Sequence, residues 1–197
     1  MVLSRQRRLR RAPIAALLFL ALVCAGRAGA DVPAANQAML VLRILSYDRN
    51  VADRAGKEVT IAVLARAGSA ASESMQGSIA GALQEAGSRT AVSGLPVKVV
   101  KLNWAGAAKL ESDLAASHAS ALYVGPELAD AIGQLPRIAQ KHRILSFSEG
   151  DEYVNSGVSI ALVRRENRVA IVVNLPGARS EGADLDSALL RIAEVVR

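Results

Sequence analysis

The chain has 197 residues, with 24 basic and 18 acidic side chains and a net charge of +6. Six arginines precede the first acidic residue, Asp31, so the rest of the chain has 18 basic and 18 acidic side chains. This balance does not favour nucleic-acid binding, because a basic footprint must lie on the folded domain.

The first thirty residues have the layout of a secretory signal peptide. A front of five arginines, apolar residues 14–25 and the small residues Ala28-Gly-Ala30 follow one another. The apolar run is shorter than the roughly 20 residues that span a bilayer. We therefore expect cleavage after Ala30, a periplasmic product and one domain over 31–197. An uncleaved anchor stays open, as does lipidation of Cys24, although Val23 is a poor residue before a lipidated cysteine.

Residues 34–51 are predicted to form the first helix of the mature chain. Apolar side chains cover it almost all round, which is typical of a helix that is buried or covered by a partner. Core packing, a homodimer and a partner surface are the three interpretations. As partner-binding candidates we name Leu40, Leu42, Arg43 and Tyr47.

Strands and helices are expected to alternate over the next hundred residues. The expected strands are 58–64, 97–102, 121–124 and 143–147, and the expected helices are 72–86, 107–114 and 128–139. Gly87 is expected at the C′ position of the first of these helices. Such alternation predicts an α/β fold with a parallel sheet.

The pattern changes after Phe147. Residues 149–153 are expected to form an acidic turn, and strands 158–163 and 168–173 flank a polar turn, which predicts an antiparallel hairpin. After a loop at 174–177, a last helix is expected over 183–196, with Asp184 as N-cap. The predicted fold class is α/β: a mixed, mostly parallel sheet flanked by helices, with a C-terminal antiparallel hairpin and a terminal helix.

Few residues of the mature chain suit catalysis. His118 and His142 are its only histidines, and the chain has no G-x-S-x-G elbow, no zinc motif and no phosphate-binding glycine motif. A secreted hydrolase stays open only because of these histidines. Glu149, Asp151 and Glu152 have the carboxylate oxygens that a cation such as calcium prefers. The alternative is that they are ordinary solvated side chains of a surface turn. No cofactor is expected.

If a small molecule binds, topology predicts where. In open α/β sheets the ligand crevice lies beyond the carboxyl ends of the strands. The residues expected there are Asn103, Trp104, Gly125, Glu127, Ser148 and Glu149. Trp104 suits stacking on a ligand, and half-burial in the core is the alternative.

Residues 143–197 resemble the YfiR-like family of periplasmic proteins. Gly157 opens a strand, Asn174 ends the next strand, and Leu189-Leu190 with Ala193 give the Leu-Leu-x-x-Ala pattern of the family. The resemblance implies a secreted, non-enzymatic α/β domain. It also implies contact with the periplasmic sensor domain of an inner-membrane diguanylate cyclase, which the protein represses.

Two departures from the family pattern concern the partner and its regulation. The chain expected after cleavage has no cysteine and so lacks the thiols that the family's disulfide-based redox response needs. Tyr47-Asp-Arg-Asn50 stands where the family has aromatic and Trp-Pro positions. The alternative function is a single-lobe periplasmic small-ligand-binding protein related to transport receptors.

Overall fold

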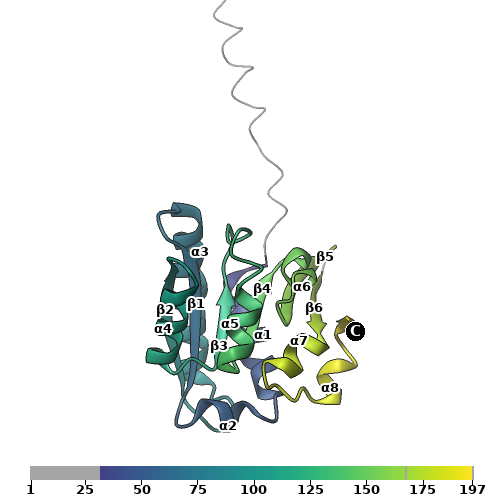
Figure 1. Cartoon of the computed structure of the whole chain (residues 1–197). Helices are drawn as coiled ribbons and strands as arrows, with labels where there is room; N and C mark the ends of the chain where they lie inside the picture. Colours follow the sequence, from purple (N-terminus) through teal and green to yellow (C-terminus); the bar gives the residue numbers. More distant parts are fainter. Residues whose placement is uncertain (1–31, 167, 197) are drawn as a thin grey trace, which may run out of the picture. The chain divides into compact units, whose positions relative to one another are not determined.

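The computed structural model describes residues 32–166 and 168–196. They form a seven-stranded sheet in the order β2-β1-β3-β4-β5-β6-β7, with helices on both faces (Figure 1). The strands are β1 (Val59–Arg66), β2 (Val97–Trp104), β3 (Ala121–Val124), β4 (Leu145–Glu149), β5 (Ile160–Arg165), β6 (Arg168–Asn174) and β7 (Glu194–Val196). The predicted signal peptide and Cys24 lie outside the described residues.

The sheet is mixed, as predicted. Strands β1 to β5 are parallel, β5 and β6 form the antiparallel hairpin, and β7 runs parallel to β6. The chain leaves β1 for β2 and then returns past β1 to β3. Because the strand order reverses there, the topological switch point lies between β1 and β3.

Two apolar clusters lie on the two faces of the sheet. The larger joins α1 and α3 to alternate residues of β1, β3, β4, β5 and β6, and the smaller lies under α4 and α5, which cover the other face (Figure 1). The helices are α1 (Ala34–Ser46), α2 (Val51–Ala55), α3 (Ala70–Arg89), α4 (Ala107–Ser117), α5 (Leu135–His142), α6 (Asp151–Asn155), α7 (Leu175–Ser180) and α8 (Ser187–Leu190). None of the helices in the described ranges could cross a bilayer.

Three predicted helix boundaries are wrong for packing reasons. The first helix ends at Ser46 rather than at residue 51, because the chain turns there to bury Asp48 against Arg54 of α2. Helix α3 continues past Gly87, since this glycine serves close packing: a Cβ there would lie 2.7 Å from the Val97 Cβ of β2. Helix α5 begins only at Leu135, with Pro136 in its first turn. The preceding Leu128 is fully buried in an irregular segment that the helical spacing did not reveal.

Short helices replace two predicted loops. Residues 151–155 of the expected acidic turn form α6, in which Tyr153 and Val154 are buried. The expected loop at 174–177 becomes the start of α7: the Asn174 side chain caps it by accepting a hydrogen bond from the Gly177 amide at 3.0 Å.

The predicted terminal helix over 183–196 is also wrong. Only α8 is helical, its N-cap is Asp186 rather than Asp184, and Glu194–Val196 pair with β6 as β7. The apolar residues that were expected to face the core together do not all do so, since Leu189 is fully buried whereas Ile192 is 68% exposed. The β-branched residues Val195 and Val196 pair with the free edge of β6. This tertiary pairing outweighs the helical spacing of the apolar residues.

Candidate functional site

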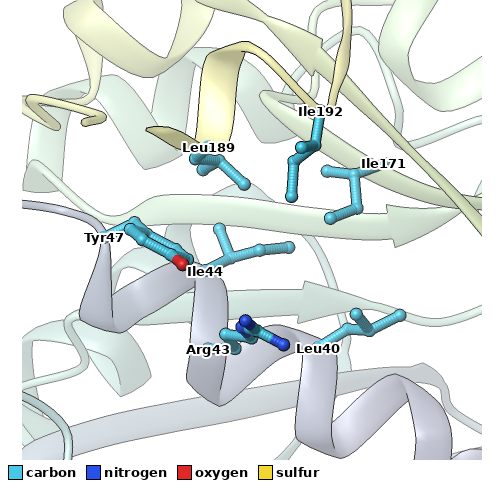
Figure 2. Close-up of a pocket in the computed structure, with 7 residues that line it drawn as sticks. All are labelled: Leu40, Arg43, Ile44, Tyr47, Ile171, Leu189 and Ile192. Atoms are coloured by element: carbon cyan, nitrogen blue, oxygen red, sulfur yellow. The ribbon is translucent and has the colours of Figure 1, made fainter. Parts of the chain in front are cut away.

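An apolar groove runs along the outer face of α1. Its first hollow, of about 100 Å³, is lined by Leu40, Arg43, Ile44 and Tyr47 of α1 together with Ile171, Leu189 and Ile192 (Figure 2). Its second hollow, of about 320 Å³, is lined by Met39, Leu40, Leu42, Arg43, Ser46 and Thr90. We call the two hollows together the α1 groove.

Helical spacing explains why α1 presents this groove. Val41, Leu42 and Leu45 point into the core, whereas Met39 and Arg43, four residues apart, lie on the outer face. Across the first hollow, Figure 2 shows Ile171, Leu189 and Ile192 opposite the α1 side chains. The first hollow is therefore built from α1, β6 and the segment of Leu189 and Ile192, whereas α1 and Thr90 line the second hollow.

The α1 groove has exposed apolar side chains in both hollows. Among the described residues, the exposed large hydrophobic side chains are Met39 at 56%, Ile192 at 68% and Val196 at 42%. Met39 lines the second hollow and Ile192 the first. Exposed apolar surface that clusters in this way is typical of an interaction site.

The four predicted partner-binding residues do not share one environment. Arg43 is exposed, and Leu40 and Tyr47 are half-buried at the groove. Leu42 is only 2% exposed and belongs to the main core cluster. A charged residue at position 42 should therefore destabilise the fold rather than affect binding alone. Met39 and Ile192 were missed, since helical periodicity cannot show which side of an all-apolar helix is covered.

A buried ion pair fixes the C-terminal end of α1. The Asp48 carboxylate pairs with the Arg54 guanidinium, and their side chains are 0% and 3% exposed. Asp48 also accepts hydrogen bonds from the amides of Asn50 and Asp184, at 3.0 and 2.9 Å. Arg54 donates to the carbonyls of Ser120 and Arg143, at 3.2 and 3.0 Å.

The chain around residues 182–186 is bonded to the end of α1 by further contacts. The Asp186 amide donates to the Tyr47 carbonyl at 2.9 Å, and Arg49 forms an exposed ion pair with Asp186 at 2.7 Å. We call residues 47–54 and 182–186, with the bonds between them, the clasp. The clasp holds the segment that supplies Leu189 and Ile192 against α1.

Side-chain contacts join the loops that follow β1 and β3, at the carboxyl edge where the ligand crevice was predicted. At the switch point, the Arg66 side chain donates to the Glu127 carbonyl and pairs with Asp130. The Ser69 hydroxyl donates to the Glu127 carboxylate. Gly125 is buried, and a Cβ there would lie 2.6 Å from the Leu64 carbonyl oxygen. These contacts tie the loop after β3 to the end of β1 and the start of α3.

The other predicted crevice residues are distributed over that edge. Asn103 is exposed on the edge strand β2, and Trp104 is half-buried against the cluster under α4 and α5. Ser148 is fully buried, and its hydroxyl has no partner among the described residues. Glu149 accepts a hydrogen bond from the Val32 amide at 3.2 Å. Of the six predicted residues, Gly125 and Ser148 are buried and Asn103 is exposed, so they differ in their access to a ligand.

A separate hollow of about 190 Å³ lies beside this edge. Its lining residues are Glu127, Ala129, Ile132, Glu152, Tyr153 and Ser156, and Glu127 alone belongs to the predicted set. Burial raises the pKa of the Tyr153 phenol, whose hydroxyl lies 3.4 Å from the Gly125 carbonyl oxygen. The hollow combines two carboxylates with apolar surface.

The remaining candidates for chemistry lie apart from one another. His118 is the C-cap of α4, and His142, in the last turn of α5, lies 4.0 Å from Glu111. Asp151, a candidate cation ligand, binds both guanidinium nitrogens of Arg165 at 2.6 and 2.7 Å, which lowers its pKa. Within residues 32–166 and 168–196, no group of three or more His, Cys, Asp or Glu is placed to hold a metal ion.

A buried carboxylate, Glu181, was missed by sequence reasoning. It is 1% exposed and accepts hydrogen bonds from the Ser146 amide at 2.8 Å and from the hydroxyls of Ser146 and Ser159 at 2.6 and 2.5 Å. Burial raises its pKa to about 7, opposed by these hydrogen bonds and by the charge of Arg54. Glu181 adjoins the clasp, so its ionisation bears on the stability of that region.

Residues 34–194, nearly the whole described chain, match the model of the YfiR/HmsC-like family. The chain belongs to this family. The family is one of periplasmic regulators rather than enzymes. The resemblance predicted from residues 143–197 is thus confirmed, and the match also covers the N-terminal half.

Solved structures share the fold at low sequence identity. A conserved domain protein from Vibrio cholerae matches at 17% identity and a TM-score of 0.59, over 84% of this chain and 60% of that one. An ABC domain in complex with L-Trp from Streptococcus pneumoniae matches at 14% identity and a TM-score of 0.58, over 84% of this chain and 62% of that one. A third match is the ligand-free, open structure of a substrate-binding protein with adhesive properties from Clostridium difficile. Its sequence identity is 16% and its TM-score 0.55, over 75% of this chain and 57% of that one.

This YfiR/HmsC-like chain therefore spans about three fifths of the length of those structures. Among curated proteins there is no significant match.

Proposed function

We propose that this protein binds the periplasmic sensor domain of an inner-membrane signalling protein through the α1 groove and represses it. A diguanylate cyclase is the partner class that the YfiR-like resemblance implies. The observation that carries the proposal is the pair of exposed apolar residues, Met39 at 56% and Ile192 at 68%, one in each hollow of the groove. In a family of regulators, such a surface suits a protein partner.

Repression follows from differential affinity. A sensor domain exchanges between an inactive and an active state, and a protein that binds the inactive state more tightly shifts the population toward it. No reaction is required of the regulator. Export would bring the protein to the sensor, and we propose that residues 1–30 are removed as a signal peptide and that 31–197 is the single mature domain. Mass spectrometry of the exported protein tests the cleavage site.

The contact surface is tested by crosslinking in the native envelope, followed by identification of the captured membrane protein. Met39→Glu and Ile192→Glu should each abolish capture and raise cyclic-di-GMP, because a carboxylate would have to be buried without a partner. Ala116→Glu is the matched control, since Ala116 is exposed on α4, on the other face of the sheet. Normal capture by both groove variants would refute the proposed surface.

The hollow at Glu127 and Tyr153 favours a second candidate function, the binding of a small ligand. It lies beside the sheet edge at which open α/β folds bind ligands, and one similar fold is described as a substrate-binding protein. A thermal-shift screen against small metabolites tests this candidate. A stabilising ligand whose effect survives Ile132→Glu would place the site elsewhere, and an absence of any stabilisation would count against the candidate.

A further inference from the structure

The α1 groove has a cation at its centre. Leu40 and Arg43 line both hollows, so the ridge between the hollows carries the Arg43 guanidinium. Figure 2 shows Arg43 beside Leu40 on the exposed side of α1. Arg43 makes no ion pair or hydrogen bond within the described residues, whereas the neighbouring Arg49 is paired with Asp184 and Asp186. The central charge of the groove is therefore available to an incoming group.

This charge also discriminates between possible occupants. A symmetric pair of chains formed about the ridge would set two Arg43 guanidinium groups against each other. Like charges placed face to face disfavour such a contact. A purely apolar segment would bury the guanidinium without a counter-charge, which is also unfavourable. An acidic group on a different protein meets neither objection.

We propose that the occupant of the α1 groove is an amphipathic segment of a partner protein with an Asp or Glu opposite Arg43, an inference that rests on the proposed function. Apolar side chains on either side of this carboxylate fill the two hollows, the bulkier one entering the larger hollow beside Met39 and Thr90. Arg43 lies in the last turn of α1 and so also offsets the negative end of the helix dipole.

The surrounding apolar residues strengthen such an ion pair. When a segment covers Met39, Leu40 and Ile192, water is excluded from around the guanidinium, and a hydrogen-bonded carboxylate replaces it. Close charge pairs at desolvated interfaces couple by about 1.5 kcal/mol or more, which corresponds to about tenfold in affinity. The same pair on an open surface would change affinity far less.

Synthetic peptides test the charge preference directly. Three helical peptides of about 14 residues match the 13-residue length of α1. They share Leu and Phe positions on one face and differ only in a central Glu, Gln or Lys. Titrations of the purified, isotope-labelled protein are followed by NMR. The Glu peptide should bind about tenfold more tightly than the Lys peptide and should shift amides of α1 and of residues 189–192.

Variants of Arg43 supply the matched comparison. Arg43→Met keeps the aliphatic stem and should bind the Glu and Gln peptides equally well. Arg43→Glu should reverse the preference, in favour of the Lys peptide. Because Arg43 is exposed, Arg43→Met should leave the melting temperature nearly unchanged. Arg43→Glu should lower it by a few degrees at most, since it places a negative charge at the end of the helix dipole. Equal binding of all three peptides by the original protein, or shifts confined to other elements, would overturn the proposal.

The same variants separate this inference from the proposed function. If Met39→Glu abolishes crosslinking in the envelope and Arg43→Glu does not, the contact surface stands and the acidic partner segment is refuted. If neither variant affects crosslinking, the proposed function itself fails at this surface. A stable dimer that Met39→Glu dissociates and that no peptide displaces would show a self-interface and overturn the inference.

Discussion

Replacement of Glu181 by glutamine should change how stability depends on pH. The Glu181 carboxyl is buried and has a folded-state pKa of about 7, against 4.5 in the unfolded chain. Desolvation is the principal cause, and the three hydrogen bonds from Ser146 and Ser159 oppose it only in part. The folded state therefore holds the proton more tightly than the unfolded state does. Its stabilising contribution is fully present below pH 4.5 and is lost as the pH rises through 7.

The magnitude follows from the two pKa values. A rise from 4.5 to about 7 corresponds to about 3 kcal/mol, of which about 2.5 kcal/mol is lost between pH 5 and pH 8. Glutamine mimics the neutral carboxyl and does not titrate. Glu181→Gln should therefore match the original protein at pH 5 and exceed it in stability at pH 8. Urea unfolding measures this as a midpoint difference of about 1 M, for a slope of about 2 kcal/mol/M.

Other titrating groups cancel in this comparison, because both proteins contain them. Glu85→Gln is the matched control, since the Glu85 side chain is 70% exposed in a surface ion pair with Arg89. Its stability curve should run parallel to that of the original protein at every pH. Parallel curves for Glu181→Gln as well would show that the carboxyl ionises normally, and the argument from burial would be refuted.

Two further predictions concern the clasp and the switch point. Arg54→Met should destabilise the fold by about 3–5 kcal/mol, because it leaves Asp48 buried and unpaired; calorimetry should show almost no change for Arg89→Met, whose ion pair is exposed. Gly125→Ala should reduce stability by about 1–3 kcal/mol, since the added Cβ would lie 2.6 Å from the Leu64 carbonyl oxygen. Gly133→Ala, with no atom within 4 Å of the added Cβ, should be close to neutral in the same urea titration, and equal effects at both glycines would contradict the packing argument.

The parts of the fold that the sequence predicted correctly depend on local patterns. Apolar runs of four to eight residues bounded by glycine, proline or polar turns predicted β1 to β6 and the antiparallel hairpin. The end of the chain depends on distant partners instead. Asp48 and Tyr47 bond residues 184–186 in an extended conformation, and the edge of β6 pairs with residues 194–196. Both partners lie outside residues 183–196. The helical spacing of the apolar residues in that segment therefore predicted the wrong structure.

The candidate site was less predictable than the fold. Sequence reasoning selected α1 because it is apolar nearly all round, but could not separate Leu42, which is 2% exposed, from Met39, which is 56% exposed. The far wall of the groove comes from Ile171, Leu189 and Ile192, more than a hundred residues away in sequence. The ion pair between Asp48 and Arg54 was missed because neither residue stands in an apolar pattern that indicates burial.

The construction of the groove links partner binding to the folding of both chain ends. The first hollow has α1 as one wall and Ile171 of β6 with Leu189 and Ile192 as the other. It is therefore complete only while the clasp holds the segment of Leu189 and Ile192 against α1. A partner that binds only this assembled form must stabilise the clasp by mass action. Conversely, anything that weakens the clasp, such as loss of the Arg54 charge beside Asp48, lowers the fraction of molecules competent to bind and raises the apparent dissociation constant by the same factor. A variant altered far from the groove should thus weaken the proposed partner contact without losing any contact residue.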